Sequence, residues 1–256
     1  MKFFLYFAIC AGFLLATYRL KWLSFAGAAT AAFFGFSLLV LGGAAWIAPV
    51  LFFFATSSIL SKINKITSQD AERGEDVRDA WQVLSNGGVA WGLLLLSAFN
   101  TNALLCYVGF AGALAAATAD TWGTELGRLG NGVTRSILTG RVVSRGTSGG
   151  MSWQGTLGGA IGAGLIGGIA WYSGSGIDLH LFLCIALAGI AGSLADSLLG
   201  AAVQARYQNQ QTGEVSEYPD ERTHLISGLR WMDNNMVNCC CTLAGAVAAM
   251  VCWYFR

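Results

Sequence analysis

Long apolar stretches alternate with polar connections along the whole chain, and this pattern predicts its fold. A helix needs about 20 apolar residues to cross the hydrocarbon layer of a bilayer. We expect membrane-spanning helices at residues 3–18, 22–41, 44–60, 81–99, 102–120, 154–173, 181–203 and 236–254. The chain is therefore predicted to be an all-α integral membrane protein, a polytopic bundle of about eight transmembrane helices that forms a single domain over residues 1–256.

Positive charge is concentrated on alternate connections. Of the 15 Lys and Arg residues, all except the terminal Lys2 and Arg256 follow an odd-numbered span, and the connections after spans two, four and six contain none. By the positive-inside rule, the connections after odd spans are cytoplasmic or stromal, and both termini face the outer side. The main loops on the inner side are residues 61–79, 128–152 and 205–230.

Composition excludes a soluble globular protein, because 55% of the residues are hydrophobic and only 11% are charged. The lipid bilayer is therefore an expected partner, and we expect no nucleic acid. The net charge of +1 adds nothing about partners, since in a membrane protein the distribution of charge matters more than its sum. We expect a multi-pass membrane protein, and the family resemblance described below implies a bacterial or cyanobacterial inner membrane, or a plastid membrane.

Carboxylates at the ends of apolar spans are the first candidates for chemistry. The run ADTWGTELG places Asp120 and Glu125 at the end of the fifth span, Asp196 lies within the seventh, and Asp233 precedes the eighth. An ionisable residue inside a membrane is costly and is by default a functional-site hypothesis. We assign all four to metal-binding or acid–base roles, and Asp120, Glu125 and Asp196 to a metal. Oxygen-rich ligands favour Mg²⁺ over zinc or copper.

A glycine-rich turn follows these acids and precedes the sixth span. Such a turn, feeding a helix N-terminus, offers backbone N–H groups and a positive dipole to a phosphate. Amide side chains are expected on the same side of the membrane. The candidate nucleotide- or phosphate-binding residues are Arg141, Arg145, Gly146, Thr147, Gly149, Gly150, Gln82, Asn86, Asn234 and Asn238.

Clustered acids, arginines and a phosphate-binding turn are the parts that phosphoryl transfer requires, because its catalysis is mostly positioning and charge neutralisation. For any single acid, pairing with an arginine at a helix end is an equally good explanation. The convergence of the whole set on one side favours a site. The chain contains no Walker motif, which excludes a P-loop fold at the level of sequence.

Four ordered motifs then support a family resemblance. They are DAWQVLSNGGVA, ADTWGTELG, TGRVVSRGTSGGMSWQGT and GLRWMDNNMVN, and over residues 20–254 the chain resembles the plant and cyanobacterial phytyl-phosphate kinase family. The resemblance implies an enzyme that transfers a phosphoryl group from a nucleoside triphosphate, expected to be CTP, to an isoprenyl (phytyl-like) monophosphate. The diphosphate product serves tocopherol and related prenyl-lipid synthesis. At Asn235 the chain departs from the family, which often has a second acid there.

Two alternatives stay open. A lipid-alcohol kinase or a cytidylyltransferase would use similar groups. A transporter or flippase of a prenyl lipid or another anionic substrate would also explain intramembrane acids and glycine-rich helices. Alternating access needs polar groups along a path through the membrane, however, and spans two and three contain no ionisable residue. This asymmetry favours the enzyme.

Overall fold

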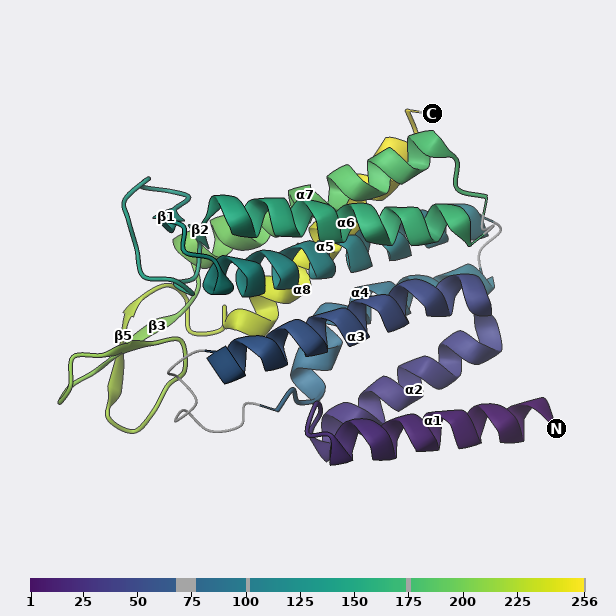
Figure 1. Cartoon of the computed structure of the whole chain (residues 1–256), viewed down its shortest axis with the longest axis horizontal. Helices are drawn as coiled ribbons and strands as arrows, with labels where there is room; N and C mark the ends of the chain where they lie inside the picture. Colours follow the sequence, from purple (N-terminus) through teal and green to yellow (C-terminus); the bar gives the residue numbers. More distant parts are fainter. Residues whose placement is uncertain (68–76, 100–101, 174–175, 256) are drawn as a thin grey trace.

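The computed structural model describes residues 1–67, 77–99, 102–173 and 176–255, in which eight helices form one bundle (Figure 1). The helices are α1 (Lys2–Arg19), α2 (Phe25–Leu41), α3 (Ala44–Thr67), α4 (Ala80–Phe99), α5 (Ala103–Leu129), α6 (Trp153–Tyr172), α7 (Leu179–Ala202) and α8 (Asn234–Trp253). Each corresponds to one of the predicted spans, so the all-α membrane fold is confirmed. Both termini lie at one end of the bundle, opposite the C-terminal ends of α1, α3, α5 and α7 (Figure 1). Which side of the membrane each end faces stays a prediction.

Six of these helices are long and apolar enough to cross a membrane by length and composition: α1, α3, α4, α5, α7 and α8. Helix α2 is also apolar but has only 17 residues. Helix α6 has 20 residues and is dense in glycine, whose lack of a side chain dilutes its hydropathy. The bundle is therefore multi-pass, with α2 set apart by its length and α6 by its glycine content.

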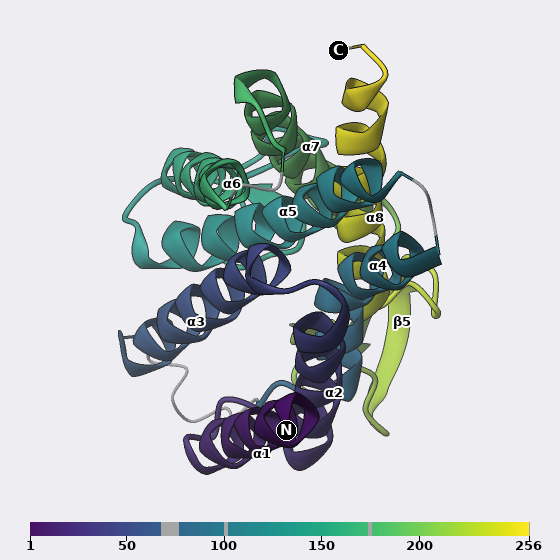
Figure 2. The same ribbon diagram turned by 90° about the vertical axis from the view of Figure 1, so that its right-hand side faces the viewer.

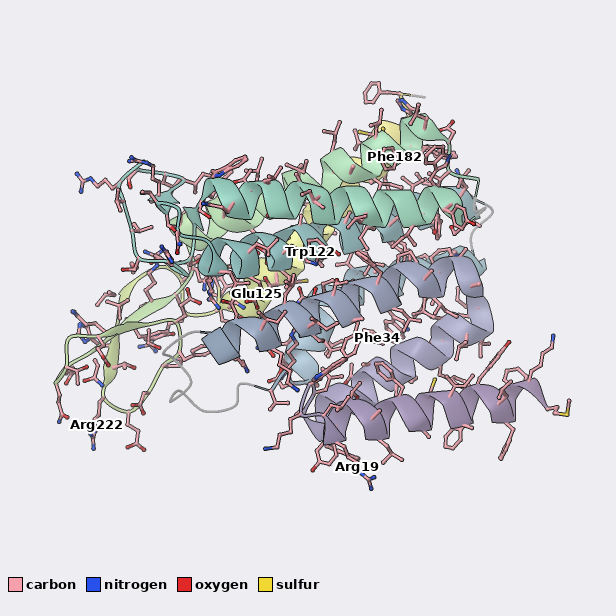
Figure 3. All side chains as sticks on the ribbon, viewed as in Figure 1. Arg19, Phe34, Trp122, Glu125, Phe182 and Arg222 are labelled. Carbon is pink, nitrogen blue, oxygen red and sulfur yellow. The ribbon has the colours of Figure 1, made fainter. Side chains whose placement is uncertain are left out.

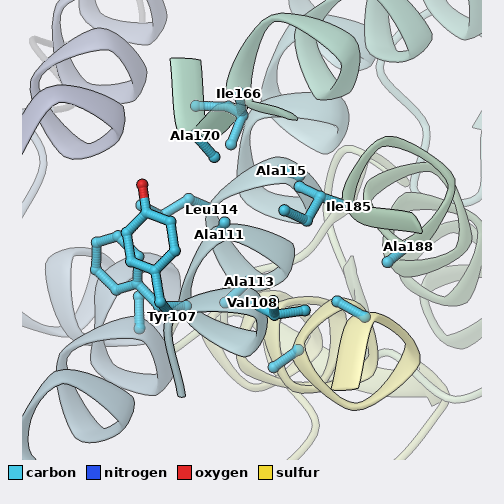
Figure 4. Close-up of a cluster of buried hydrophobic side chains, with 14 of the residues drawn as sticks. Tyr107, Val108, Ala111, Ala113, Leu114, Ala115, Ile166, Ala170, Ile185 and Ala188 are labelled. Carbon is cyan, nitrogen blue, oxygen red and sulfur yellow. The ribbon is translucent and has the colours of Figure 1, made fainter. Parts of the chain in front are cut away.

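Helix α5 is the centre of the bundle. It packs against α3, α4, α6, α7 and α8, and 78% of its most apolar stretch is buried (Figure 2). Tyr107, Leu114 and their neighbours on α5 meet Ile166 of α6 and Ile185 of α7 in the main apolar core (Figure 4). Polar residues at the end of α5 are therefore held by helices on several sides.

Small residues bring the central helices into close contact. A Cβ atom added at Gly155 of α6 would lie 2.5 Å from the carbonyl oxygen of Gly123, and one at Gly159 would lie 2.6 Å from that of Ala119. The close packing predicted from the glycine spacing of the sixth span is confirmed at these two positions. Gly164 and Gly168 face open space instead.

Helices α3 and α5 are longer than predicted. Helix α5 continues to Leu129, so Asp120 and Glu125 lie inside it and not at its end. Helix α3 continues to Thr67, so the first part of the predicted loop 61–79 is helical; residues 68–76 lie outside the described residues. A hydropathy profile places the end of a span at the first helical turn that contains polar residues. The helix itself can continue beyond that turn where neighbouring helices pack against it.

Two small antiparallel sheets, absent from the sequence prediction, cover the polar end. The first pairs β1 (Arg135–Ser136) with β2 (Gly150–Met151). The second has the order β4-β3-β5, formed by Val215–Ser216, Arg206–Asn209 and Thr223–Ser227. Both lie at the left of Figure 1, where strand pairing satisfies backbone polar groups of the long loops.

Candidate active site at the polar end of the bundle

A cavity of about 2770 Å³ opens among the helices and reaches the loops at the polar end. Most of the candidate residues from the sequence line it: Gln82, Asn86, Asp120, Glu125, Arg145, Gly146, Thr147, Gly149, Gly150, Asp196, Asn234 and Asn238. Residues from α4, α5, α7, α8 and the loop before α6 therefore share one space. Arg141 and Asp233 are not among its lining residues.

Asp120 and Asp196 form the centre of the site. Their carboxyl groups, on α5 and α7, lie within hydrogen-bonding reach of each other. Two carboxylates this close repel each other when both are ionised. The pair therefore either shares a proton or holds a cation between its two groups. The Oδ2 atom of Asp196 is buried and has no hydrogen-bond partner. Since buried polar atoms are nearly always paired, this oxygen calls for a partner, which a proton shared with Asp120, a water molecule or a ligand would supply.

Glu125 points elsewhere. Five residues at about 100° each place it roughly 140° around the helix from Asp120, so it faces α3. Ser61 donates a hydrogen bond to its Oε1 at 2.5 Å, and Asn64 donates to its Oε2 at 2.5 Å and to its backbone carbonyl at 2.7 Å. Figure 3 shows Glu125 near α3, and Trp122 of α5 donates to Thr56 of α3 at 3.2 Å. The structure thus uses Glu125 to join α3 to α5.

Arg78 supports this joint from outside the helices. Its guanidinium donates a hydrogen bond to the Ser61 hydroxyl at 3.1 Å. Burial lowers the pKa of Arg78, while the charge of Glu125 acts in the opposite direction. Ser61 therefore connects Arg78 to the Glu125 carboxylate. This arrangement agrees with the alternative explanation for a single acid, in which the acid pairs with an arginine at a helix end. The assignment of Glu125 to a metal stays a prediction, although its carboxylate is directed towards α3.

Asp233 also has a structural role. It is the N-cap of α8, where its Oδ1 accepts a hydrogen bond from the backbone N–H of Met236 at 2.8 Å. It is exposed and outside the cavity, so the catalytic assignment is not supported by its position. Arg141 is likewise exposed and does not line the cavity. An Asp before an apolar helical run is a standard capping signal, and that reading applies here.

The glycine turn lines the cavity, but packing explains its glycines. Gly146 and Gly149 have φ of +79° and +74°, which disfavours other residues. A Cβ atom on Gly149 would also lie 2.7 Å from the carbonyl oxygen of Ser197 on α7. The N–H groups of Thr147 and Gly150 bond within the turn, and Ser152 caps α6 by accepting from Gly155 N–H. The turn therefore docks on α7, and a role of its glycines in phosphate binding stays a prediction.

The amides divide into a capping residue and cavity-facing residues. Gln82 accepts a hydrogen bond from the backbone N–H of Asp79, and Asp79 accepts one from Gln82 N–H, which is a capping box at the start of α4. Asn86 donates to the Gln82 carbonyl at 3.0 Å. Asn234 and Asn238 line the cavity one turn apart on α8. Asp79 followed three residues later by Gln82 is the sequence pattern typical of the capping box at the start of α4.

Three charged residues join the site that were not among the candidates. Arg128 at the end of α5, Arg206 of β3 and Glu217 after β4 all line the cavity. Arg206 is fixed by hydrogen bonds to the carbonyls of Ser148 at 2.9 Å and Gly200 at 3.3 Å. Burial raises the pKa of Glu217, and the nearby Arg206 and Arg128 partly offset that rise. The mixed-sign loop 205–230 carried no local signal that Arg206 and Glu217 line the cavity.

A metal site made wholly of protein carboxylates is not present among the described residues, where no group of three or more His, Cys, Asp or Glu side chains converges. The Asp120–Asp196 pair is the part of the predicted set that does converge. Mg²⁺ is commonly held by one or two carboxylates together with waters and substrate phosphates. The pair therefore fits a magnesium–phosphate complex and not a metal cage.

Helices, cavity and loops together define a multi-pass integral membrane protein with a polar site at one end. The chain belongs to the family described as "Integral membrane protein DUF92", whose match covers residues 8–246. No solved structure matched the chain.

Three curated relatives illustrate the family. The chain is 34% identical to "Uncharacterized membrane protein MJ0933" of Methanocaldococcus jannaschii over 67% of this chain and 71% of that protein. It is 32% identical to "Protein PGR" of Arabidopsis thaliana over 93% and 92% of the two chains. It is 23% identical to "Protein VTE6, chloroplastic" of the same plant over 83% of this chain and 60% of that protein.

Proposed function

We propose that the protein is a membrane-bound kinase that transfers a phosphoryl group from a nucleoside triphosphate, with CTP as the expected donor, to an isoprenyl monophosphate. The single observation that supports this most is the Asp120–Asp196 pair, with an unpartnered buried oxygen, inside a cavity that is also lined by Arg128 and Arg145. Paired acids with opposing arginines suit a substrate that brings both phosphate and a divalent cation.

Magnesium is the metal that this arrangement fits. Asp120 and Asp196 would hold it, and it would neutralise charge on the transferred phosphoryl group when bound. An ion between the two carboxylates would also remove the repulsion of their paired charges. The Oδ2 atom of Asp196 supplies an oxygen that no protein donor uses.

The reaction joins an oxygen of the isoprenyl monophosphate to the γ-phosphorus of the nucleotide. The bond between that phosphorus and the β,γ-bridging oxygen breaks, which releases a nucleoside diphosphate and the isoprenyl diphosphate. Arg128, Arg145 and Arg206 face the same cavity and would neutralise the phosphate oxygens. Catalysis then depends on positioning and charge more than on covalent participation by the protein.

Relatives and motifs support the same function. The four motifs resemble the phytyl-phosphate kinase family, and the chain is a distant relative of Protein VTE6. Three of the motifs contribute residues to the cavity at Asn86, Asp120 and Arg145, and the fourth does so at Asn238. Residues from four motifs that are far apart in the sequence therefore line one cavity, as expected if the motifs form a single active site.

The test uses Asp120→Asn and Asp196→Asn in the purified full-length chain. Each nearly preserves shape while removing a charge, so diphosphate formation from CTP and phytyl monophosphate is expected to fall by about three orders of magnitude or more at unchanged thermal stability. The matched control is Asp233→Asn, because asparagine caps helices as well as aspartate. It should leave activity per folded molecule near that of the wild type.

Other outcomes separate the alternatives. Near-normal diphosphate formation by folded Asp120→Asn protein would remove the proposed site. Release of pyrophosphate in place of a nucleoside diphosphate would identify a cytidylyltransferase, and phosphorylation of the free prenyl alcohol a lipid-alcohol kinase. Movement of a prenyl lipid across proteoliposomes, with no phosphoryl transfer by the wild type, would identify a flippase.

A further inference from the structure

The cavity has an apolar arm in addition to its polar end. We define the apolar arm by Phe13 of α1, Phe34 and Leu38 of α2, and Phe53 and Phe54 of α3, all of which line the same cavity as Asp120 and Asp196. Hydrocarbon-lined and phosphate-suited surfaces therefore share one continuous space. A ligand that occupied the whole of it would be an amphiphile with an anionic head.

Packing of the peripheral helices creates this arm. Helix α1 packs on α2, α2 on α4, and α3 on α5, whereas α2 and α3 make little contact with each other. Figure 2 shows α3 diverging from the α1–α2 hairpin. Aromatic side chains close the arm between α1 and α3: the ring centroids of Phe13 and Phe54 are 5.2 Å apart, and those of Trp22 and Phe54 are 5.8 Å apart.

Two polar atoms at the cavity wall are unpartnered. The indole Nε1 of Trp22 and the hydroxyl of Ser58 are buried without a hydrogen-bond partner, and both residues line the cavity. Because buried polar groups are nearly always paired, each calls for a water molecule or a polar part of a ligand within the cavity. Ser58 lies one turn from Ser61, between the apolar arm and the polar end.

We propose that the apolar arm binds the isoprenoid chain of the substrate while its phosphate lies at the Asp120–Asp196 pair. This inference rests on the proposed function. The aromatic walls suit a single branched chain, because they can make van der Waals contacts along its length. The length of the arm then sets which chain lengths are preferred, so the peripheral helices, and not the acids, determine specificity for the lipid.

A photolabelling experiment tests occupancy without requiring catalysis. The full-length chain in phosphatidylcholine nanodiscs is labelled with farnesyl monophosphate that carries a diazirine at the far end of its chain, and the labelled peptides are mapped by mass spectrometry. We expect label on the peptides of Phe13, Phe34 and Phe54, displaced by geranylgeranyl monophosphate. Label confined to lipid-facing peptides, or displaced equally by phosphatidic acid, would show that the arm holds bilayer lipid and overturn the inference.

Kinetic variants test specificity. Phe13→Ala and Phe54→Ala should each raise the KM for the 20-carbon monophosphate severalfold at similar kcat, because van der Waals contact with the chain is lost. The matched control is Phe7→Ala on α1, since Phe7 is 67% exposed and outside the cavity. Gly35→Leu fills the arm, where an added Cβ would meet only Cys10 Sγ at 3.9 Å, and should shift preference towards the 10-carbon substrate.

The outcomes distinguish this inference from the proposed function. Protein that labels in the arm but transfers no phosphoryl group would disprove the kinase and leave the arm as a lipid-binding site. Protein that transfers a phosphoryl group, but whose chain-length preference is the same in Gly35→Leu, Phe13→Ala and Phe54→Ala as in the wild type, would disprove the arm alone.

Discussion

The helices around α5 and the helices α1 to α3 are built from different residues for different surroundings. In α5, 78% of the most apolar stretch is buried, against 6% in α1. The central helices meet through glycine and alanine, while the peripheral helices present large aromatic and aliphatic side chains to lipid and to the cavity. Close backbone contact gives a rigid frame for Asp120 and Asp196, whereas side-chain contact leaves the space that we propose for a substrate chain.

The contrast follows from what drives association in lipid. Apolar side chains gain little by leaving lipid for other apolar side chains, so tight contact depends on small residues and interhelical hydrogen bonds. Helix α5 has both, with Gly112 against α8 and Glu125 against α3. A substitution should therefore cost much more in the central helices than in the peripheral ones.

The largest expected effect compares the same change in the two regions. A Cβ added at Gly112 of α5 would lie 2.5 Å from Ala249 Cβ and 2.6 Å from the Gly245 carbonyl oxygen, while none of the described atoms lies within 4 Å at Gly12 of α1. Gly112→Ala should destabilise the protein by about 1–3 kcal/mol or more. Gly12→Ala should be neutral or stabilising by up to about 1 kcal/mol. Thermal unfolding in detergent measures both, and equal shifts would contradict the contrast.

The joint between the regions provides the next test. Asn64→Leu removes two of the hydrogen bonds that Glu125 receives and should cost about 1–3 kcal/mol. Adding Glu125→Leu should recover part of that loss, since the Oε2 atom left without a donor is then also removed. Activity per folded molecule should fall far less than in Asp120→Asn. A loss as large as that in Asp120→Asn would restore Glu125 to the catalytic set.

The glycine turn permits a matched pair of substitutions. Gly149 and Gly140 have similar positive φ, +74° and +66°, so alanine strains both by a similar amount, on the order of 1 kcal/mol. Only at Gly149 does the new Cβ also meet α7. Gly149→Ala should therefore reduce folded yield and melting temperature more than Gly140→Ala. If Gly149→Ala instead folds normally and raises only the KM for the nucleotide, the turn serves phosphate after all.

The smallest expected effect is a pH dependence at the loop after β4. Burial raises the pKa of Glu217, so the folded protein holds this proton more tightly than the unfolded chain does. Its contribution to stability is full below the ordinary value of 4.5 and is lost as pH rises through the higher folded pKa. Glu217→Gln should flatten the fall in melting temperature over this range. The exposed Glu221→Gln is the control, and an identical slope in wild type and Glu217→Gln would refute the assignment.

Local pattern was enough for the fold and for part of the site. The eight apolar stretches and the charges on alternate loops can be read directly from the sequence, and they were enough to predict the helices. The spacing of small residues in the sixth span likewise predicted the close contacts of Gly155 and Gly159. The run around Asp120 was identifiable because an acid in an apolar helix is costly wherever its neighbours lie.

Tertiary structure decided what each polar residue does. Asp120 and Asp196 come together because α5 and α7 pack side by side, while Glu125, five residues from Asp120, turns to Ser61 and Asn64 of α3. Interhelical contacts such as these depend on the depth and angle of helix packing, which hydropathy does not encode. Arg206 and Glu217 enter the cavity for the same reason, because a small sheet folds their loop over the polar end.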